Sequence, residues 1–174
     1  MIKCIVAVDK YWKIGRTNPE TGKGELLFKL PLDLKHFKRV TSGNIVAMGY
    51  NTLLSLPGAK PLPNRVNVVL CPEGVEVEDC ICLHDFDETV SCLENLSRHG
   101  SDVFIIGGAM FYKSMLPYCD LAYVTKVDAD GQGEVDFPNL DKDPEWKLAD
   151  NSDAYQPIED NDYTTRFCIY ERVK

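Results

Sequence analysis

The sequence contains no apolar run of membrane-spanning length, and its hydrophobic opening at residues 5–8 is shorter than a signal peptide and stops at Asp9. It also lacks the GxSxG and HExxH motifs, and its three histidines, His36, His84 and His99, show no triad spacing. Acidic residues outnumber basic ones, 27 to 19, and the net charge of −8 argues against a broad nucleic-acid footprint. These absences predict a protein without nucleic-acid or membrane partners, and they give little support to hydrolase or metal-site chemistry.

Cysteine is present, but the spacing that builds metal or redox motifs is missing. The chain has an odd number of cysteines, seven, with no CxxC pair and no matching partner for the pair Cys80 and Cys82. Scattered cysteines of this kind are typical of reduced core or strand residues in a cytoplasmic protein. They lie at Cys4, Cys71, Cys80, Cys82, Cys92, Cys119 and Cys168.

A length of 174 residues and a hydrophobic content of 44% predict one domain over residues 1–174 with a single core. Short apolar runs at 1–8, 45–48, 66–70, 81–83, 103–106 and 121–127 indicate strands. Helices are expected after Pro31, at 49–55, at 87–98 and from about 108 to 116, and residues 146–148 and 163–170 are expected to form a closing antiparallel pair. We expect an α/β fold: a mostly parallel central sheet of about eight strands with an antiparallel C-terminal strand, flanked by about four helices.

The stretch from 9 to 29 is polar and rich in glycine and proline, so we expect a long loop that acts as a lid. The helix that follows begins at Pro31, and its inner face is expected to carry Leu34 and Phe37. Asp33 lies in the first turn, between two leucines. An acid there either favours the helix dipole or faces an apolar cleft, where an ionised carboxylate needs a cationic or donor-rich partner.

Two glycine-containing turns each join a strand to a helix. One contains Gly107 and Gly108, and the other contains Gly49 with Asn51 and Thr52 close behind. Two helix starts at strand ends suit the phosphates of a dinucleotide, although neither turn is a GxGxxG fingerprint. Each turn on its own also fits a tight connection, or a helix N-cap supplied by Asn51 or Thr52.

Two further polar residues have both a structural and a functional interpretation. Arg65 follows a proline-rich turn and could bind a ligand carboxylate bidentately, or it could be a solvated surface residue. Thr125 lies in an expected strand, where a β-branched side chain on a half-solvated face is usual.

Taken together and in order, these segments closely resemble the dihydrofolate reductase family over nearly the whole chain, from Met1 to about Arg172. The resemblance rests on IVA at 5–7, IG at 14–15, LPLDL at 30–34 with Phe37 and Lys38, MG at 48–49 with Thr52, PLPNR at 61–65, IGG at 106–108 with Tyr112, YVT at 123–125 and DFP at 136–138. It implies reduction of 7,8-dihydrofolate to tetrahydrofolate with hydride from NADPH. It also implies binding of diaminopyrimidine and pteridine antifolates.

The resemblance also implies roles for individual residues. Asp33 would bind the pterin amino group and ring N–H, Thr125 would hydrogen-bond to it or to the pterin, Phe28 would stand in the catalytic loop, and water would protonate N5. The implied substrate residues are Ile5, Asp33, Leu34, Phe37, Leu56, Lys60, Leu62, Arg65, Ile106, Tyr112 and Thr125. The implied cofactor residues are Ala7, Ile14, Gly15, Gly49, Tyr50, Asn51, Thr52, Leu70, Cys71, Ile106, Gly107, Gly108, Ala109, Met110, Phe111 and Tyr112. The family pattern further implies a cis peptide bond between Gly107 and Gly108.

The chain departs from the family pattern in its lid and at the adenosine end. The lid carries extra residues around 19–25, and Phe28 replaces the usual tryptophan, which removes an indole N–H. Tyr50, Cys71 and Met110 stand where the family has basic or hydroxyl residues near the 2′-phosphate. We therefore hypothesise a weaker preference for NADPH over NADH, unless His84 or nearby lysines compensate.

Two alternatives were weighed against this interpretation. The fold-related pyrimidine reductase of riboflavin synthesis would need neither Asp33 in its helix nor Arg65 after the proline turn. A degenerate, non-catalytic relative that only binds ligand would fit the altered phosphate site, but Asp33, Thr125 and both glycines are retained.

We expect the protein to be a cytoplasmic monomer.

Overall fold

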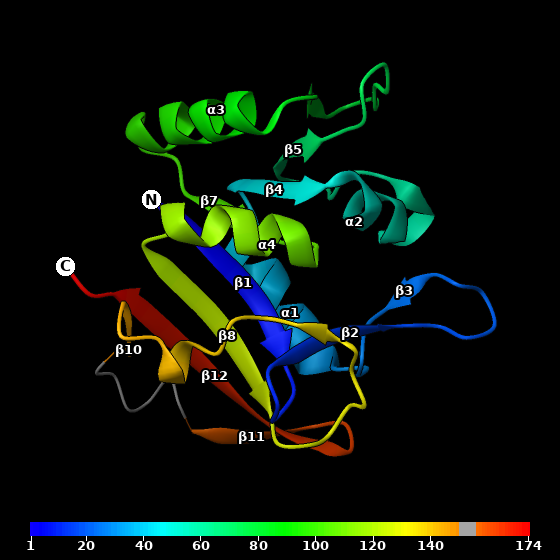
Figure 1. The fold of residues 1–174 in the computed structure, drawn as a ribbon, viewed down its shortest axis with the longest axis vertical. Coiled ribbons are helices and arrows are strands. Elements are labelled where there is room, and N and C mark those ends of the chain that lie inside the picture. Colours follow the sequence, from blue (N-terminus) through cyan, green and yellow to red (C-terminus); the bar gives the residue numbers. More distant parts are fainter. Residues whose placement is uncertain (150–155) are drawn as a thin grey trace. The chain divides into compact units, whose positions relative to one another are not determined.

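The structure, a computed structural model, describes residues 1–149 and 156–174 (Figure 1). Its internal contacts divide the chain into two compact units. Unit 1 comprises Met1–Ile5 and Lys38–Asp120, and unit 2 comprises Val6–Phe37 and Leu121–Lys174. The strand that opens the chain and the first helix each contribute residues to both units.

The helical segments are α1 (Pro31–Thr41), α2 (Tyr50–Ser55), α3 (Phe86–Arg98) and α4 (Ala109–Met115), with short 3₁₀ turns at Pro57–Ala59, Leu116–Tyr118 and Leu140–Lys142. The strands are β1 (Ile2–Val8), β2 (Lys13–Thr17), β3 (Gly24–Glu25), β4 (Ile45–Gly49), β5 (Val66–Leu70), β6 (Ile81–Leu83), β7 (Val103–Ile105), β8 (Leu121–Val127), β9 (Val135–Asp136), β10 (Trp146–Leu148), β11 (Pro157–Asp160) and β12 (Tyr163–Arg172).

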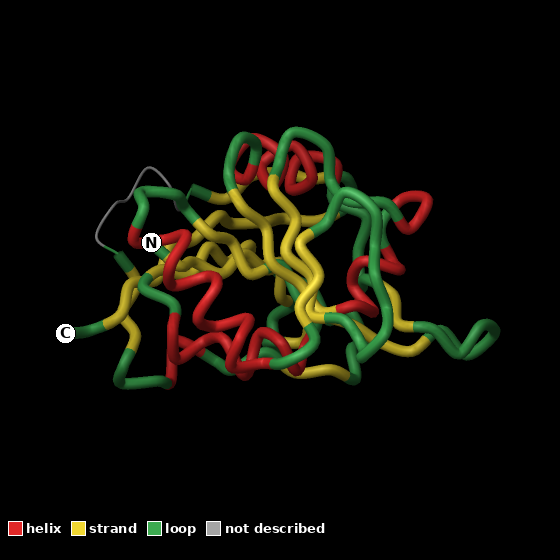
Figure 2. Tube along the Cα trace, turned by 90° about the horizontal axis from the view of Figure 1, so that it is seen from above, coloured by secondary structure: helices red, strands yellow, loops and turns green. Residues whose placement is uncertain are grey.

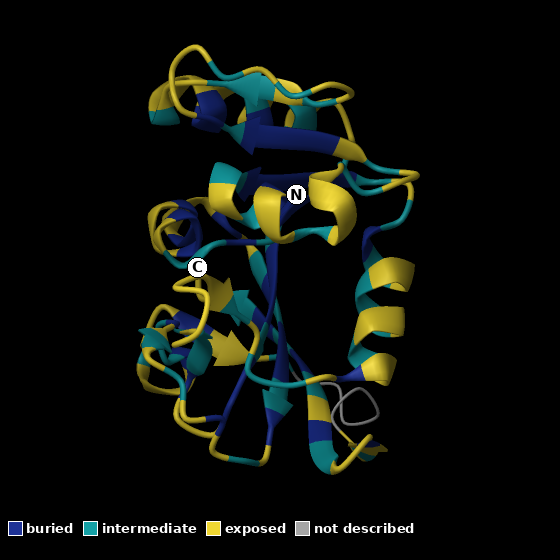
Figure 3. Ribbon diagram, turned by 90° about the vertical axis from the view of Figure 1, so that its right-hand side faces the viewer, coloured by how far each residue is buried: buried dark blue, intermediate teal, exposed yellow. Residues whose placement is uncertain are grey.

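Unit 1 is built on a parallel sheet in the order β1-β7-β4-β5-β6. Its strands are almost continuously apolar, as expected when helices cover both faces, and they form the buried centre of the unit (Figure 3). Val46, Ala47, Val68 and Val69 are all fully buried.

Helix α3 follows the sheet's last strand and begins with a side-chain cap. Asp85 accepts a hydrogen bond from the backbone N–H of Glu88, 3.0 Å away. Val90 and Leu93 form its buried face.

Unit 2 has a mainly antiparallel arrangement in which β12 pairs with β8, β10 and β11, and β8 is followed in the sheet by β1. Its core is aromatic: Trp12 stacks on Phe137, 6.3 Å between ring centroids, and meets Tyr170 edge-on at 5.9 Å. A separate small sheet, β3-β2-β9, lies within the same unit. None of the helices in the described ranges has the length and apolar character needed to cross a bilayer.

The predicted α/β class is confirmed, with parallel strands in unit 1, antiparallel strands in unit 2 and, within the described residues, the helices α1–α4. The prediction of one unbroken loop over 9–29 was wrong. Residues in this stretch form the hairpin β2–β3, which extends from the rest of unit 2 (Figure 2). Strands β9 and β11 were also missed, because each is short and lacks an apolar alternation.

Candidate active site

The first turn of α1 presents Asp33 to a hydroxyl group on β8. Thr125 Oγ1 donates a hydrogen bond to Asp33 Oδ1 over 2.6 Å, and Thr125 is only 3% exposed. Among the described residues, no hydrogen bond reaches the second carboxylate oxygen of Asp33. The structure therefore brings together the acid and the hydroxyl that the family pattern pairs, and it leaves the acid with acceptor capacity for a ligand.

The pKa of Asp33 lies above its ordinary value. Burial is the main cause, and the negative charge of Asp160 adds to it, whereas the hydrogen bond from Thr125 acts in the opposite direction. Burial makes the ionised form of Asp33 costly, because the carboxylate loses hydration. A cationic or donor-rich ligand that binds to the carboxylate would offset this cost.

The apolar side chains of α1 are arranged differently from the prediction. Leu34 is 62% exposed and does not lie on the inner face, whereas Phe37 is half-buried as expected. Residues 33, 36 and 37 share one face of the helix at i, i+3 and i+4, and His36 stacks on Phe167 of β12 with ring centroids 4.0 Å apart. Leu34 lies three positions before Phe37 on the helix, yet only Phe37 is covered by the rest of the chain.

The lid is an ordered hairpin with its own polar network. Arg16 Nε donates to Glu25 Oε1 over 2.8 Å, and Asn18 Nδ2 donates to Glu25 Oε2 over 2.9 Å. Together these interactions hold the pKa of Glu25 below its ordinary value, with the hydrogen bond from Arg16 as the largest cause. The extra residues near 19–25 therefore close the tip of a β-hairpin.

Buried Asp9 anchors the base of this lid. Its carboxylate accepts hydrogen bonds from the backbone N–H groups of Tyr11, Lys13 and Gly131 at 2.8–3.0 Å. Gly131 in turn packs closely: a Cβ there would lie 2.8 Å from Cζ of Phe28. The loop after β8 thus fixes both the start of the lid and the residue that replaces the family tryptophan.

In unit 1, the turn at Gly107 and Gly108 contains the cis peptide bond that the resemblance implies. Gly107 has φ of +122°, and a Cβ on it would lie 3.3 Å from the ring of Tyr112. A Cβ on either glycine would also lie 3.4 Å from Thr52 Oγ1. Glycine is therefore needed at 107, where φ is positive and a side chain would press on the Tyr112 ring, and a side chain at either position would occupy space beside the Thr52 hydroxyl.

Neighbouring groups hold this turn in place. The Gly49 N–H donates to the carbonyl oxygen of Gly107 over 2.8 Å, and the buried Tyr112 hydroxyl donates to the carbonyl oxygen of Ile5 over 2.7 Å. The residue at the N-cap of α2 is Gly49, with no side-chain cap, so the alternative in which Asn51 or Thr52 caps the helix was wrong. A bare backbone beside a hydroxyl is an arrangement that fits a pyrophosphate, so these residues suit a dinucleotide cofactor.

Arg65 is held by its own unit and is not a freely solvated side chain. Its Nη1 donates to Thr41 Oγ1 over 3.0 Å, and its Nε donates to the carbonyl oxygen of Pro63 over 2.9 Å. Thr41 is fully buried at the end of α1. These contacts orient a half-buried guanidinium, which is what bidentate binding of a carboxylate needs.

The adenosine end predicted around Cys71 contains a histidine paired with an acid. His84 Nε2 lies 2.9 Å from Glu76 Oε1, and His84 Nδ1 lies 3.0 Å from the carbonyl oxygen of Pro72. The pKa of His84 is raised, chiefly by Glu76. Cys71 itself is buried, and burial together with Cys82 raises the pKa of its thiol to about 12.

The remaining predicted residues differ in exposure. Ile5, Phe111 and Tyr112 are buried, and Lys60, Asn51 and Met110 are exposed. The half-buried ones are Ala7, Ile14, Gly15, Tyr50, Leu56, Leu62, Leu70, Ile106 and Ala109. All seven cysteines are free thiols, as predicted.

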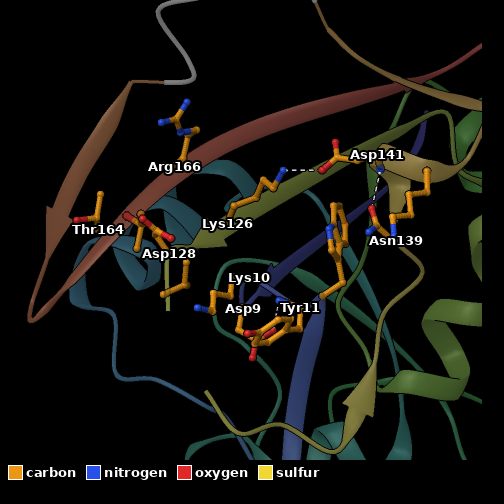
Figure 4. A pocket seen from close by; sticks show the side chains of 13 residues that line it. Asp9, Lys10, Tyr11, Lys126, Asp128, Asn139, Asp141, Thr164 and Arg166 are labelled. Carbon is orange, nitrogen blue, oxygen red and sulfur yellow. Dashed lines mark hydrogen bonds and ion pairs between the residues drawn. The ribbon is translucent and has the colours of Figure 1, made fainter. Parts of the chain in front are cut away.

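A separate cavity of about 780 Å³ in unit 2 contains none of the predicted residues (Figure 4). It is lined by Lys10, Tyr11 and Lys126 among others, with Lys126 Nζ bonded to Asp141 Oδ2 over 2.7 Å. Because side chains alternate along β8, Lys126 points to the sheet face opposite Thr125. The cavity is therefore distinct from the surroundings of Asp33.

Sequence analysis also assigns no role to Asp160, which is fully buried beside α1. Around residue 160 the sequence indicates only a turn. The groups that bind the Asp160 carboxylate, the backbone N–H groups of Asp33 and Leu32, lie 127 and 128 residues away, so no local pattern identifies them.

Comparison with known proteins places this geometry in a family. The family described as Dihydrofolate reductase matches residues 1–172. The dihydrofolate reductase of Bacillus subtilis is 33% identical over 174 residues, which cover 99% of this chain and 95% of that protein. That of Haemophilus influenzae is 33% identical over 169 residues, covering 97% and 96%. A solved structure of the dihydrofolate reductase from Enterococcus faecalis, complexed with NADP(H) and RAB-propyl, has a TM-score of 0.82 and 28% identity, covering all of this chain and 97% of that one.

Proposed function

Because this chain belongs to the dihydrofolate reductase family and reduces dihydrofolate with NADPH, we propose that Asp33 is the carboxylate that binds and orients the pterin ring. A pterin presents an amino group and a ring N–H side by side, and one carboxylate can accept hydrogen bonds from both. The observation that carries this proposal is the 2.6 Å hydrogen bond from buried Thr125 to Asp33, which fixes one carboxylate oxygen. The other oxygen accepts no hydrogen bond within the described part of the chain.

We assign the remainder of the substrate to the other residues that the family pattern implies. Leu34 and Phe37 would provide apolar contact, and the exposed side chain of Leu34 supports such a role. Ile5, Leu56 and Ile106 are proposed as further apolar substrate residues. Arg65 would bind the α-carboxylate of the glutamate tail, supported by the orientation that Thr41 and Pro63 give its guanidinium. Lys60, Leu62 and Tyr112 complete the proposed set.

The reduction also requires a proton at N5 of the pterin. Asp33 binds the opposite edge of the ring, so we propose that water supplies this proton while Asp33 fixes orientation and electrostatics. The hairpin β2–β3 and Phe28 would control access of that water. Phe28 is held edge-on against Tyr163, 4.7 Å between ring centroids, and so keeps an apolar wall in the lid.

When bound, NADPH supplies the hydride. We propose that Thr52, Gly107 and Gly108 hold its pyrophosphate, since the glycine backbone and the Thr52 hydroxyl leave room that a side chain would fill. Ala7, Ile14 and Gly15 would border the nicotinamide. The other proposed cofactor residues are Gly49, Tyr50, Asn51, Leu70, Cys71, Ile106, Ala109, Met110, Phe111 and Tyr112.

The preference for NADPH over NADH is proposed to be weaker than is usual in the family. His84 lies beside Pro72 and is paired with Glu76 at 2.9 Å, so even a protonated His84 offers little net positive charge to a 2′-phosphate. The measurement is kcat/KM with each cofactor. A preference for NADPH above roughly a thousandfold, about 4 kcal/mol, would contradict this proposal.

The proposed ligands include antifolates with a protonated diaminopyrimidine or a pteridine head, which would bind the same carboxylate. A cytoplasmic location also remains a prediction, supported by the free state of all seven cysteines.

The test of the assignment is Asp33→Asn, which keeps the shape of the side chain and removes its charge. We expect turnover, followed as the loss of NADPH absorbance after adding dihydrofolate, to fall by orders of magnitude while the protein stays folded. Asp87→Asn is the matched control, because Asp87 is an exposed acid in the first turn of α3 and serves only the helix dipole. Near-normal kcat for Asp33→Asn at neutral pH would refute the role given to Asp33.

A further inference from the structure

Asp160 is a buried acid whose carboxylate caps the helix that carries Asp33. It ends β11, is 0% exposed, and accepts hydrogen bonds from the backbone N–H groups of Leu32 and Asp33, each at 3.0 Å. The first N–H groups of a helix have no partner within the helix, so an acceptor here decides whether the first turn stays formed. The cap therefore acts directly on the backbone of Asp33.

The rest of the turn between β11 and β12 strengthens this attachment. Asn161 Nδ2 donates to the carbonyl oxygen of Lys29 over 3.5 Å, and the ring of Tyr163 meets the ring of Phe28 at 4.7 Å. We call residues 160–163 the C-terminal turn. It contacts the segment before α1 as well as its first turn, so one short turn supports both Phe28 and Asp33.

We propose that Asp160 is a positioning residue for the reduction, holding the first turn of α1 so that the Asp33 carboxylate stays aligned with Thr125 and ready for the pterin. This inference rests on the proposed role of Asp33. In this role Asp160 does not touch the substrate; it acts on Asp33 through the backbone N–H groups of Leu32 and Asp33 and through its negative charge.

The charge of Asp160 gives the positioning role an electrostatic signature. Around Asp33, β8 contributes the neutral hydroxyl of Thr125, and β11 contributes the negative charge of Asp160, which raises the pKa of Asp33. On the same helix, the nearby titratable His36 is stacked on Phe167. A neutral residue at 160 should therefore let the pKa of Asp33 fall toward its ordinary value.

The experiment compares Asp160→Ser and Asp160→Ala with Asp162→Ser in the full chain. The serine variant keeps one hydrogen-bond acceptor for the helix N-terminus but removes the charge, and the alanine variant removes both. Asp162 serves as the control because it is an exposed acid in the same turn. The readouts are kcat for dihydrofolate reduction and the carbon-13 NMR titration of the Asp33 carboxyl, assigned with Asp33→Asn. We expect both Asp160 variants to titrate Asp33 at lower pH than wild type, kcat to fall about tenfold in the alanine variant, and the serine variant to recover most of that loss.

The positioning role of Asp160 fails under three results. An unchanged Asp33 titration in Asp160→Ser, or wild-type kcat in a folded Asp160→Ala, would overturn it, as would equal effects in Asp162→Ser. If the alanine variant fails to fold, the titration of the serine variant decides alone. Wild-type turnover in Asp33→Asn would instead refute the proposed function, and the titration would still report whether Asp160 acts on Asp33.

Discussion

Replacing Thr125 with valine removes one hydroxyl from the surroundings of Asp33 and leaves the β-branched shape of the side chain. Thr125 is 3% exposed, and its hydroxyl donates to Asp33 over 2.6 Å, so no water can easily take its place. A hydrogen bond to a charged group contributes about 1.5–3 kcal/mol, and the lower end applies because Asp33 is half-buried. A loss of about 1.5 kcal/mol from the ionised form corresponds to roughly tenfold weaker binding of a ligand that needs the ionised carboxylate, at pH values where Asp33 of the variant is protonated.

The sign of the pH dependence follows from the same hydrogen bond. Thr125 opposes the burial that raises the pKa of Asp33, so Thr125→Val should raise this pKa further. A protonated diaminopyrimidine binds the ionised acid, and we expect the ratio of the variant's Kd to the wild-type Kd to grow as the pH falls. Titration of the ligand itself cancels in that ratio.

The assay is a series of Kd measurements by protein fluorescence, repeated across neutral and mildly acidic pH. Thr164→Val is the matched control, because Thr164 also donates to a carboxylate, Glu159 Oε1 at 3.1 Å, but in an exposed position on β12. We expect its Kd to stay at the wild-type value. A Thr125→Val variant whose Kd ratio is near one and independent of pH would refute the reasoning.

Two further predictions concern stability and substrate affinity. The pKa of Asp33 is raised in the folded state, so its ionisation costs stability as the pH rises above the ordinary aspartate pKa of about 4. Asp33→Asn should therefore melt higher than wild type by a margin that grows as the pH rises above about 4, and a margin in thermal unfolding that does not change with pH would contradict this. Arg65→Lys keeps the charge but loses the planar fork oriented by Thr41, so KM for dihydrofolate should rise about tenfold or more with kcat little changed. An unchanged KM would argue against a carboxylate at Arg65.

Local patterns predicted the elements that are formed by sequence-local rules. The apolar runs of β4 and β5 belong to this class, because burial on both faces of a sheet is recorded in a short run of neighbouring residues. The hairpin β2–β3 was missed because its stability comes from side-chain bonds between Arg16, Asn18 and Glu25, and not from an apolar alternation.

Some residues of the candidate site could likewise be predicted from the sequence. The others could not, because their contacts are with residues far away along the chain. The composition of the helix at Pro31 identified Asp33, and the family pattern supplied Thr125 as its partner. No local rule could identify Asp160 or Asp9, since the backbone groups that bind their carboxylates include ones 128 and 122 residues away, respectively. Leu34 was misplaced because an apolar residue three positions before Phe37 suggests a core face, whereas its side chain is 62% exposed.

Three acids of unit 2, Asp9, Asp33 and Asp160, differ in the kind of partner that their carboxylates have. Asp9 and Asp160 accept hydrogen bonds from backbone N–H groups on both carboxylate oxygens, so their acceptor capacity serves the fold. Asp33 accepts from one side-chain hydroxyl only, within the described residues, and its first turn is supported by another acid. Because a like charge lies near it and its second oxygen is unused, Asp33 gains most from a cationic or donor-rich ligand. The distribution of backbone amides therefore separates Asp9 and Asp160, which serve the fold, from Asp33, the acid that we propose binds the substrate.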